Sequence, residues 1–194
     1  EKIITVIESL QITRVIYVSS DAVYTDIKTP MTENSSTEPL SLHGIMHLTR
    51  EIMLKNIPGI NLSIVRPTLI YGHKDPHNGY GQNQFFKLLS EGKDISLFGK
   101  GEEERDHVYI YDVAKLINKL ILSHHNGILN IASGEVTTFK KIANKINNFY
   151  SNKVSVIENP RKGEMPHGGY RSFNIDKINK LFPDYTMTTI DDGL

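Results

Sequence analysis

The chain contains 194 residues, of which 39% are hydrophobic, and this length suits one domain, or one and a half, with a buried core. Its 22 Lys and Arg residues balance 22 Asp and Glu residues, so the lack of a basic excess argues against a nucleic-acid partner or a membrane surface. Cysteine is absent, which excludes disulfides and thiol catalysis and fits a reducing cytoplasm. No apolar run approaches the roughly 20 residues that a membrane-spanning helix needs.

Hydrophobic periodicity divides the chain into alternating helices and strands. In chain order we predict a helix over 1–10, a strand over 14–19, a loop over 26–39, a helix over 41–57, a strand over 62–65, a loop over 73–82, a helix from 85 to 92, a strand over 95–98, a turn over 99–104, a strand over 107–110, a helix over 112–122, a strand over 128–131, a helix over 137–150, a strand over 153–157 and a helix over 176–181. Asp112 is the predicted cap at the start of its helix.

The predicted strands are short and apolar, and helices separate most of them. This pattern is typical of a mostly parallel α/β sheet that is covered on both faces. Ligands bind such sheets at the carboxyl ends of the strands. Three predicted strand ends carry residues of interest, namely Ser19-Ser20, Arg66-Pro67 and Ala132-Ser133-Gly134.

Two histidines, His43 and His47, are four residues apart in the predicted helix that follows Ser20. Residues with this spacing share one helix face, and an imidazole that titrates near neutral pH can move a proton. A catalytic cluster of Ser20 with both histidines is one interpretation. The same residues also fit an ordinary turn and an exposed helix surface. A third interpretation is a metal site, although such a site needs further ligands and no cysteine exists to supply them.

Two arginines follow predicted strands and could contact phosphate groups. Arg105 comes after the glycines of Phe98-Gly-Lys-Gly, which allow close approach of a ligand to the backbone. The alternative there is a hairpin turn in which Arg105 makes an exposed ion pair with Asp106 or a neighbouring Glu. Arg161 lies in Asn159-Pro-Arg-Lys-Gly-Glu, which also fits a solvated basic turn. By themselves these two signals are weak.

A series of short motifs follows in order along nearly the whole chain. They are Val18-Ser-Ser-Asp-Ala-Val-Tyr24, Thr32-Glu33, Glu38-Pro39, Arg66-Pro-Thr-Leu-Ile-Tyr-Gly72, Leu97-Phe-Gly-Lys-Gly101, Arg105-Asp-His-Val108, Asp112-Val-Ala114, Asn130-Ile-Ala-Ser-Gly134 and Arg161-Lys-Gly-Glu164. Each motif is unspecific alone. The ordered set resembles the extended short-chain dehydrogenase/reductase family, the NAD-dependent nucleotide-sugar epimerases and dehydratases, with Thr25 where that family usually has glycine.

The resemblance implies that the chain holds only the C-terminal half of this fold. Neither Gly-x-x-Gly-x-x-Gly nor Gly-x-Gly-x-x-Gly occurs, so no loop of the kind that binds a dinucleotide diphosphate is present. We expect an α/β fold with a partial Rossmann-type parallel sheet and a smaller α/β substrate-binding region. Residues 1–80 would complete the NAD(P)-binding domain and 81–194 would mainly bind substrate, with 107–134 returning to the Rossmann part. We expect a fragment of a longer enzyme, or a protein whose other half comes from elsewhere.

The resemblance also assigns roles to individual residues. It implies that Ser20, His43 and His47 are catalytic, that Ser19, His47, Arg66 and Pro67 contact the cofactor, and that Asn83, Phe98, Arg105 and Arg161 contact the substrate. His43 stands at the Tyr and His47 at the Lys of the family's Tyr-x-x-x-Lys. In that dyad Lys holds the nicotinamide ribose and lowers the Tyr pKa, and Tyr moves a proton as hydride is transferred. A neutral His43 could accept a hydroxyl proton, and His47 could still hydrogen-bond the ribose.

The resemblance implies NAD or NADP as cofactor, a nucleotide sugar as substrate, and a possible homodimer when the chain is full length. It predicts neither a nucleic-acid nor a membrane partner. Loss of both Tyr and Lys also fits a pseudoenzyme that binds a nucleotide sugar without oxidising it. Ala22 stands where a 4,6-dehydratase has Glu, which counts against that reaction.

Overall fold

The computed structural model describes residues 2–72 and 81–194, and it is organised around a three-stranded parallel sheet. The strands are β1 (Arg14–Val18), β2 (Asn61–Pro67) and β6 (Gly127–Ile131), in the order β1-β2-β6. All three strands run in one direction, so their carboxyl ends meet at one edge. This confirms the predicted α/β fold with a parallel sheet.

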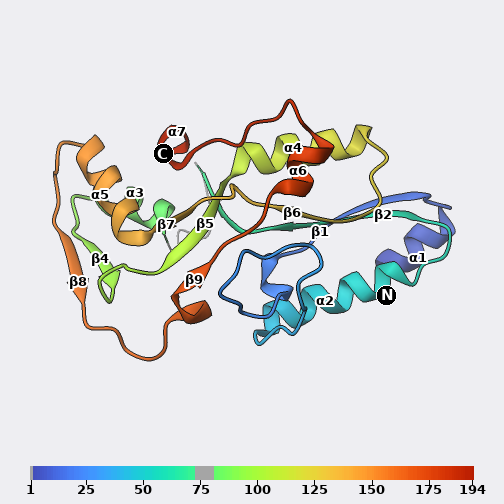
Figure 1. Cartoon of the computed structure of the whole chain (residues 1–194), viewed down its shortest axis with the longest axis horizontal. Coiled ribbons are helices and arrows are strands. Elements are labelled where there is room, and N and C mark those ends of the chain that lie inside the picture. The colour runs from blue at the N-terminus through green and yellow to red at the C-terminus, as the bar shows by residue number, and fades with distance from the viewer. Residues whose placement is uncertain (1, 73–80) are drawn as a thin grey trace.

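Helices cover both faces of this sheet. In Figure 1, α1 (Lys2–Ser9) and α2 (Leu42–Lys55) lie below it, and α4 (Ile110–Leu122) and α6 (Asp176–Leu181) lie above it. Alternate residues of β2 point to opposite faces: Leu62 and Ile64 pack with the α1 and α2 side, whereas Val65 packs with α4. Burial on both faces explains why Leu62, Ile64 and Val65 do not alternate with exposed polar residues.

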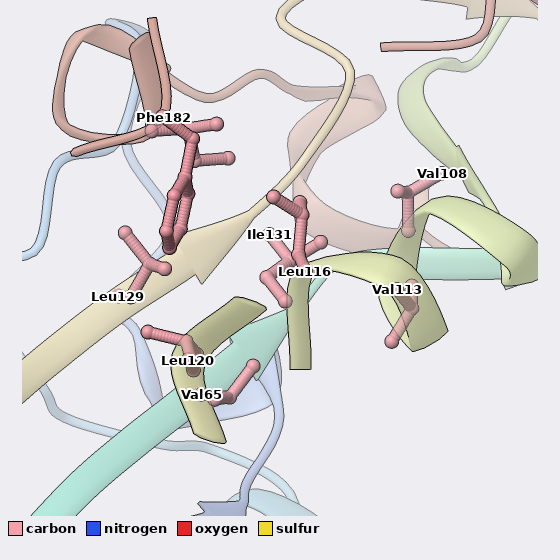
Figure 2. Close-up of a cluster of buried hydrophobic side chains, with 9 residues drawn as sticks. Val65, Val108, Val113, Leu116, Leu120, Leu129, Ile131 and Phe182 are labelled. Carbon is pink, nitrogen blue, oxygen red and sulfur yellow. The ribbon is translucent and has the colours of Figure 1, made fainter. Parts of the chain in front are cut away.

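The upper face holds the larger core cluster, part of which Figure 2 shows. Leu116 and Leu120 of α4 lie between Val65 of β2 and Leu129 of β6, and Phe182 closes the cluster from the segment after α6. The leucines are fully buried, and burying one such side chain is worth about 1.5–3 kcal/mol. This packing fixes the strands whose ends carry the candidate site.

The remaining strands form a four-stranded and a two-stranded sheet at the other end of the molecule (Figure 1). The first contains β3 (Leu69–Tyr71), β5 (Glu104–Tyr109), β7 (Val136–Thr138) and β9 (Tyr170–Arg171). The second pairs β4 (Ile95–Phe98) with β8 (Val156–Asn159), and α3 (Gln82–Ser90) and α5 (Phe139–Phe149) pack against it. The short elements are the 3-10 helices η1 (Asp21–Val23) and η2 (Pro166–Gly169), and α7 (Ile190–Gly193). Whether the chain divides into two domains at residue 80 stays a prediction.

Two sequence predictions are wrong in this region. Residues 99–104 do not form a hairpin, because β4 pairs with β8 while β5 pairs with β3, β7 and β9. Asp112 is not a helix cap, since Tyr109 holds that position. The Asp112 carboxylate instead accepts hydrogen bonds from the Tyr185 hydroxyl at 2.6 Å and the Thr188 amide at 2.8 Å, and so fixes the C-terminal segment on α4. Most of the predicted loop over 73–82 lies outside the described residues.

Candidate functional site

The helix α2 places His43 and His47 on one face at the carboxyl edge of the sheet. Ser41 caps the helix by accepting a hydrogen bond from the Gly44 amide at 3.0 Å, so the first turn is fixed. The two imidazole rings then meet edge to face, with centroids 4.6 Å apart. This confirms that the spacing brings the histidines together. His43 is exposed, whereas His47 is half-buried.

A tyrosine that the sequence analysis did not single out completes this cluster. The Tyr17 hydroxyl, on β1, lies 2.9 Å from Nδ1 of His47. Tyr17 and Ser19 point to the same face of β1 because strand residues alternate. A polar group two residues before the strand-end serine was the signal that could have identified it.

Ser20 lies two residues after the end of β1 and starts the turn that packs on α2. Its hydroxyl accepts from the Ala22 amide at 3.2 Å and so caps η1. A Cβ on Gly44 would lie only 2.1 Å from the Ala22 carbonyl oxygen, so η1 rests directly on the helix turn that carries His43. The structure therefore brings Ser20 close to the histidine pair. Within the described part of the chain its hydroxyl bonds to Ala22 and Asp21, not to His43.

A buried polar network lies one helical turn further along α2. It joins Glu51 of this helix to Ser19, just after β1, and to Arg66 of β2. Glu51, which the sequence analysis missed, accepts from the Ser19 hydroxyl at 2.6 Å and from Nε and Nη2 of Arg66 at 2.9 and 2.5 Å. The Arg66 guanidinium also lies 4.7 Å from the centroid of the Tyr24 ring. Glu51 and Arg66 are 0% and 1% exposed, so this network supports the strand ends from within the protein. Pro67, the next predicted cofactor contact, is also buried.

Among the predicted substrate residues, Phe98 and Arg161 lie at a hollow near the carboxyl ends of β4 and β8. Nη2 of Arg161 donates to the Phe98 carbonyl at 3.0 Å, which joins two of them. Phe98 and Arg161 line the hollow, together with Gln84, Phe85, Ser96, Leu97, Gly101, Glu103 and Phe139. Asn83 precedes Gln84 in α3, and its carbonyl accepts weakly from the Gly72 amide at 3.4 Å.

Arg105 does not line this hollow itself, but its ion-pair partner Glu103 does. Nη1 of Arg105 donates to Glu103 at 3.0 Å. The pair is buried, so the expected exposed ion pair is wrong. Nε of Arg105 has no hydrogen-bond partner among the described residues.

Burial shifts the pKa of His47 and of His107. Partial burial, helped by the charges of His43 and Arg50, lowers the pKa of His47, although Glu51 opposes this. His107, a histidine outside this pair, is buried, and its Nδ1 lies 2.8 Å from Nε2 of Gln82. Burial lowers the pKa of His107 to about 3. In residues 2–72 and 81–194, no group of three or more His, Cys, Asp or Glu is arranged to hold a metal ion, and His73 and His77 lie outside these ranges.

The third strand end, Ala132-Ser133-Gly134, is closed by a buried carboxylate. Asp106 accepts from the amides of Ser133 and Gly134 at 2.8 and 2.9 Å. Burial raises the pKa of Asp106 to about 6, although these hydrogen bonds oppose the shift. Asp106 thus holds the end of β6 against β5.

None of the described helices has both the length and the apolar character that crossing a membrane requires.

Comparison with known proteins identifies a family and a fold. The model of the NAD dependent epimerase/dehydratase family matches residues 1–132. A putative UDP-glucose 4-epimerase of Methanocaldococcus jannaschii is 31% identical over 172 residues, which are 84% of this chain and 56% of that protein. The chain therefore spans little more than half the length of this curated relative.

Solved structures show the same fold. The UDP-N-acetylglucosamine 4-epimerase of Methanobrevibacter ruminantium M1, in complex with UDP-N-acetylmuramic acid, has a TM-score of 0.86 at 21% identity over 99% of this chain and 65% of that one. The UDP-glucuronic acid 4-epimerase of Bacillus cereus, in complex with UDP-glucuronic acid and NAD, has a TM-score of 0.86 at 21% identity over 99% of this chain and 62% of that one.

Proposed function

Because this chain belongs to the NAD dependent epimerase/dehydratase family, we propose that it is the C-terminal portion of an NAD(P)-dependent nucleotide-sugar epimerase or reductase-like enzyme. The observation that carries the proposal is the His43–His47 pair, which lies one helical turn apart beside the end of β1. We take these two positions to be those of the family's Tyr-x-x-x-Lys. The rest of the relatives' length would supply the glycine-rich loop that this sequence lacks.

The residues at the strand ends suit one part of a dinucleotide. Tyr17, Ser20 and His47 offer uncharged hydroxyl and imidazole groups, which match ribose hydroxyls and a carboxamide. They would not neutralise a diphosphate. We therefore assign the nicotinamide–ribose end of NAD or NADP to this chain, with His47 as the ribose contact and with Ser19, Arg66 and Pro67 as support for the strand ends. When bound, the nicotinamide would accept hydride from a sugar carbon and return it.

The histidines would handle the proton. His43 is exposed and makes no hydrogen bond among the described residues, so a neutral imidazole there can accept a proton from a sugar hydroxyl. Ser20 lies in the turn that rests on the same part of α2 and would hydrogen-bond that hydroxyl. His47 keeps one ring nitrogen engaged with Tyr17, which leaves the other for the ribose.

The hollow at Phe98 would hold the nucleotide of the substrate. Phe98 is 65% exposed and could stack on a base, and Arg161 presents its guanidinium beside it. Arg105 and Asn83 lie behind the lining of this hollow: Arg105 donates to Glu103, and Asn83 precedes Gln84 in α3. Two arginines near one hollow suit a diphosphate, because each can bind it through paired hydrogen bonds. The substrate class is therefore a nucleoside-diphosphate sugar.

A binding protein without turnover is the second candidate, and the environment of His47 favours it. Lys in the family's dyad is a permanent cation that acidifies the neighbouring Tyr. His47 has a lowered pKa and is neutral at neutral pH, so it supplies no such charge. Such a protein would keep the nucleotide-sugar hollow without catalysing hydride transfer.

The proposal also covers the oligomeric state of the protein and its location in the cell. Both α1 and α2 expose apolar side chains to solvent, among them Ile3, Val6, Leu42 and Ile45. A second copy of the protein could cover these residues, which supports a homodimer of the full-length enzyme. We also propose a cytoplasmic location, which fits the absence of cysteine.

The test is turnover by the full-length protein on a panel of UDP- and dTDP-sugars. We expect His43→Phe to lower turnover by about 10²-fold or more, the usual contribution of general base catalysis. Thr49→Phe, which places the same side chain at an exposed position of α2, is the control and should leave turnover unchanged. Equal turnover by His43→Phe would remove His43 from the mechanism. Binding without turnover by the wild type would select the binding protein.

A further inference from the structure

The hydrogen bond between Tyr17 and His47 gives one histidine of the pair a fixed partner. Their rings lie 6.0 Å apart, and the Tyr17 hydroxyl is 2.9 Å from Nδ1 of His47. We propose that Tyr17 is a positioning residue whose hydroxyl donates a hydrogen bond to Nδ1 of His47 and thereby holds the single ring proton of the neutral imidazole on Nε2. The inference rests on the proposed function only for its consequence in catalysis.

The direction of the hydrogen bond follows from the acidity of the two groups. A phenol with a pKa of about 10 is a much stronger donor than the N–H of a neutral imidazole, and a bare imidazole nitrogen is the better acceptor. The groups around His47 favour its neutral form. Burial is the largest cause, a protonated His43 and the Arg50 charge on α2 act in the same direction, and Glu51 opposes them. Glu51 is itself engaged by Arg66 and Ser19.

The consequence is a histidine with a defined hydrogen-bond polarity. A neutral imidazole without a partner exchanges between two tautomers, and in one of them Nε2 is only an acceptor. With Nδ1 occupied by Tyr17, Nε2 carries the proton and can only donate. The lysine that the family has at this position also only donates. Tyr17 would therefore let His47 replace Lys as a donor to a ribose hydroxyl, while His43 stays free to gain or lose a proton.

The test measures the tautomer of His47 directly in this chain. Two-bond ¹H–¹⁵N correlation spectra of the ¹⁵N-labelled protein distinguish protonated from bare ring nitrogens, and His47→Gln assigns the signals. At a pH above the histidine pKa we expect Nε2 of His47 to be protonated and Nδ1 to be bare. In Tyr17→Phe we expect a mixture of tautomers and a His47 pKa raised by about half a unit to one unit, because the neutral form loses a donor.

Two comparisons keep the test decisive. Tyr111→Phe removes the hydroxyl of an exposed tyrosine whose ring contacts Tyr109, and it should change neither the tautomer nor the pKa of His47. A proton on Nδ1 in the wild type would overturn the proposal even if Tyr17→Phe did not fold. An unchanged tautomer and pKa in a folded Tyr17→Phe would also overturn it. The spectra need neither cofactor nor substrate, so a failure of the proposed function in the turnover assay is distinguishable from a failure here.

Discussion

Two polar clusters lie one turn apart on α2, and they differ in burial and in hydrogen bonding. At the third turn of α2, the Glu51 carboxylate is fully buried and is bonded to Ser19 and Arg66. At the first and second turns, His43 is exposed and His47 is half-buried, with Tyr17 as the only side-chain hydrogen-bond partner of its ring among the described residues. Charged groups tolerate burial only when they are paired, whereas groups that meet a ligand must keep unpaired atoms. The first cluster therefore holds the fold, and the second is available for chemistry.

The difference depends on what surrounds each cluster. Glu51 is enclosed by Arg66 of β2 and by Ser19, just after β1, whereas His47 contacts Tyr17 of β1 at the rim of the sheet and His43 lies in the exposed first turn of α2. One amphipathic helix thus carries a structural polar group and a candidate active site on adjoining turns. Mutations at the two clusters should separate stability from activity.

The largest loss of stability is expected from Glu51→Ala. The change leaves the Arg66 guanidinium, 1% exposed, as a buried charge without its carboxylate. Breaking a buried ion pair in this way costs about 3–5 kcal/mol, measurable as the free energy of unfolding in urea. Glu38→Ala removes an exposed carboxylate and should cost less than about 0.5 kcal/mol. A loss below about 1 kcal/mol for Glu51→Ala would mean that Glu51 and Arg66 do not support the fold.

A smaller loss is expected from Gly44→Ala, at the contact between α2 and η1. In an exposed helix this change would stabilise by roughly 1 kcal/mol. Here the new Cβ would meet the Ala22 carbonyl at 2.1 Å, so η1 must move away, at a cost of about 1–3 kcal/mol. Urea unfolding measures the sign. Stabilisation by Gly44→Ala would show that η1, and with it Ser20, is not seated on α2.

The smallest effect on stability is expected from His47→Gln. The side chain is half-buried and keeps a donor and an acceptor after the change, so unfolding at pH 7 should shift by less than about 0.5 kcal/mol. Because the pKa of His47 is lowered in the folded state, its protonation destabilises the protein as the pH falls below its ordinary value of about 6.5. His47→Gln should lose this part of the acid dependence. A large loss at pH 7 would place His47 with Glu51 as a structural residue.

The sequence was sufficient for the parts of the fold and the site that depend on local periodicity. The parallel sheet, the long helices and the contact between His43 and His47 follow from spacings of two and four residues. Partners distant in the chain were not predictable in the same way. Arg66 meets Glu51, Tyr17 meets His47, and Asp112 meets Thr188 only because strands and helices pack together. The short strands β3 and β7 were missed because three residues give too little periodicity.

The central claim is that positions 43 and 47 are those of the family's catalytic dyad. The most direct measurement is turnover of a nucleotide sugar by the full-length double variant His43→Tyr with His47→Lys, compared with the wild type and with His43→Tyr alone. We predict that the double variant turns over at least as fast as the wild type, because Lys again supplies the cation that acidifies Tyr. A double variant that binds NAD and the nucleotide sugar but does not turn over would contradict the claim.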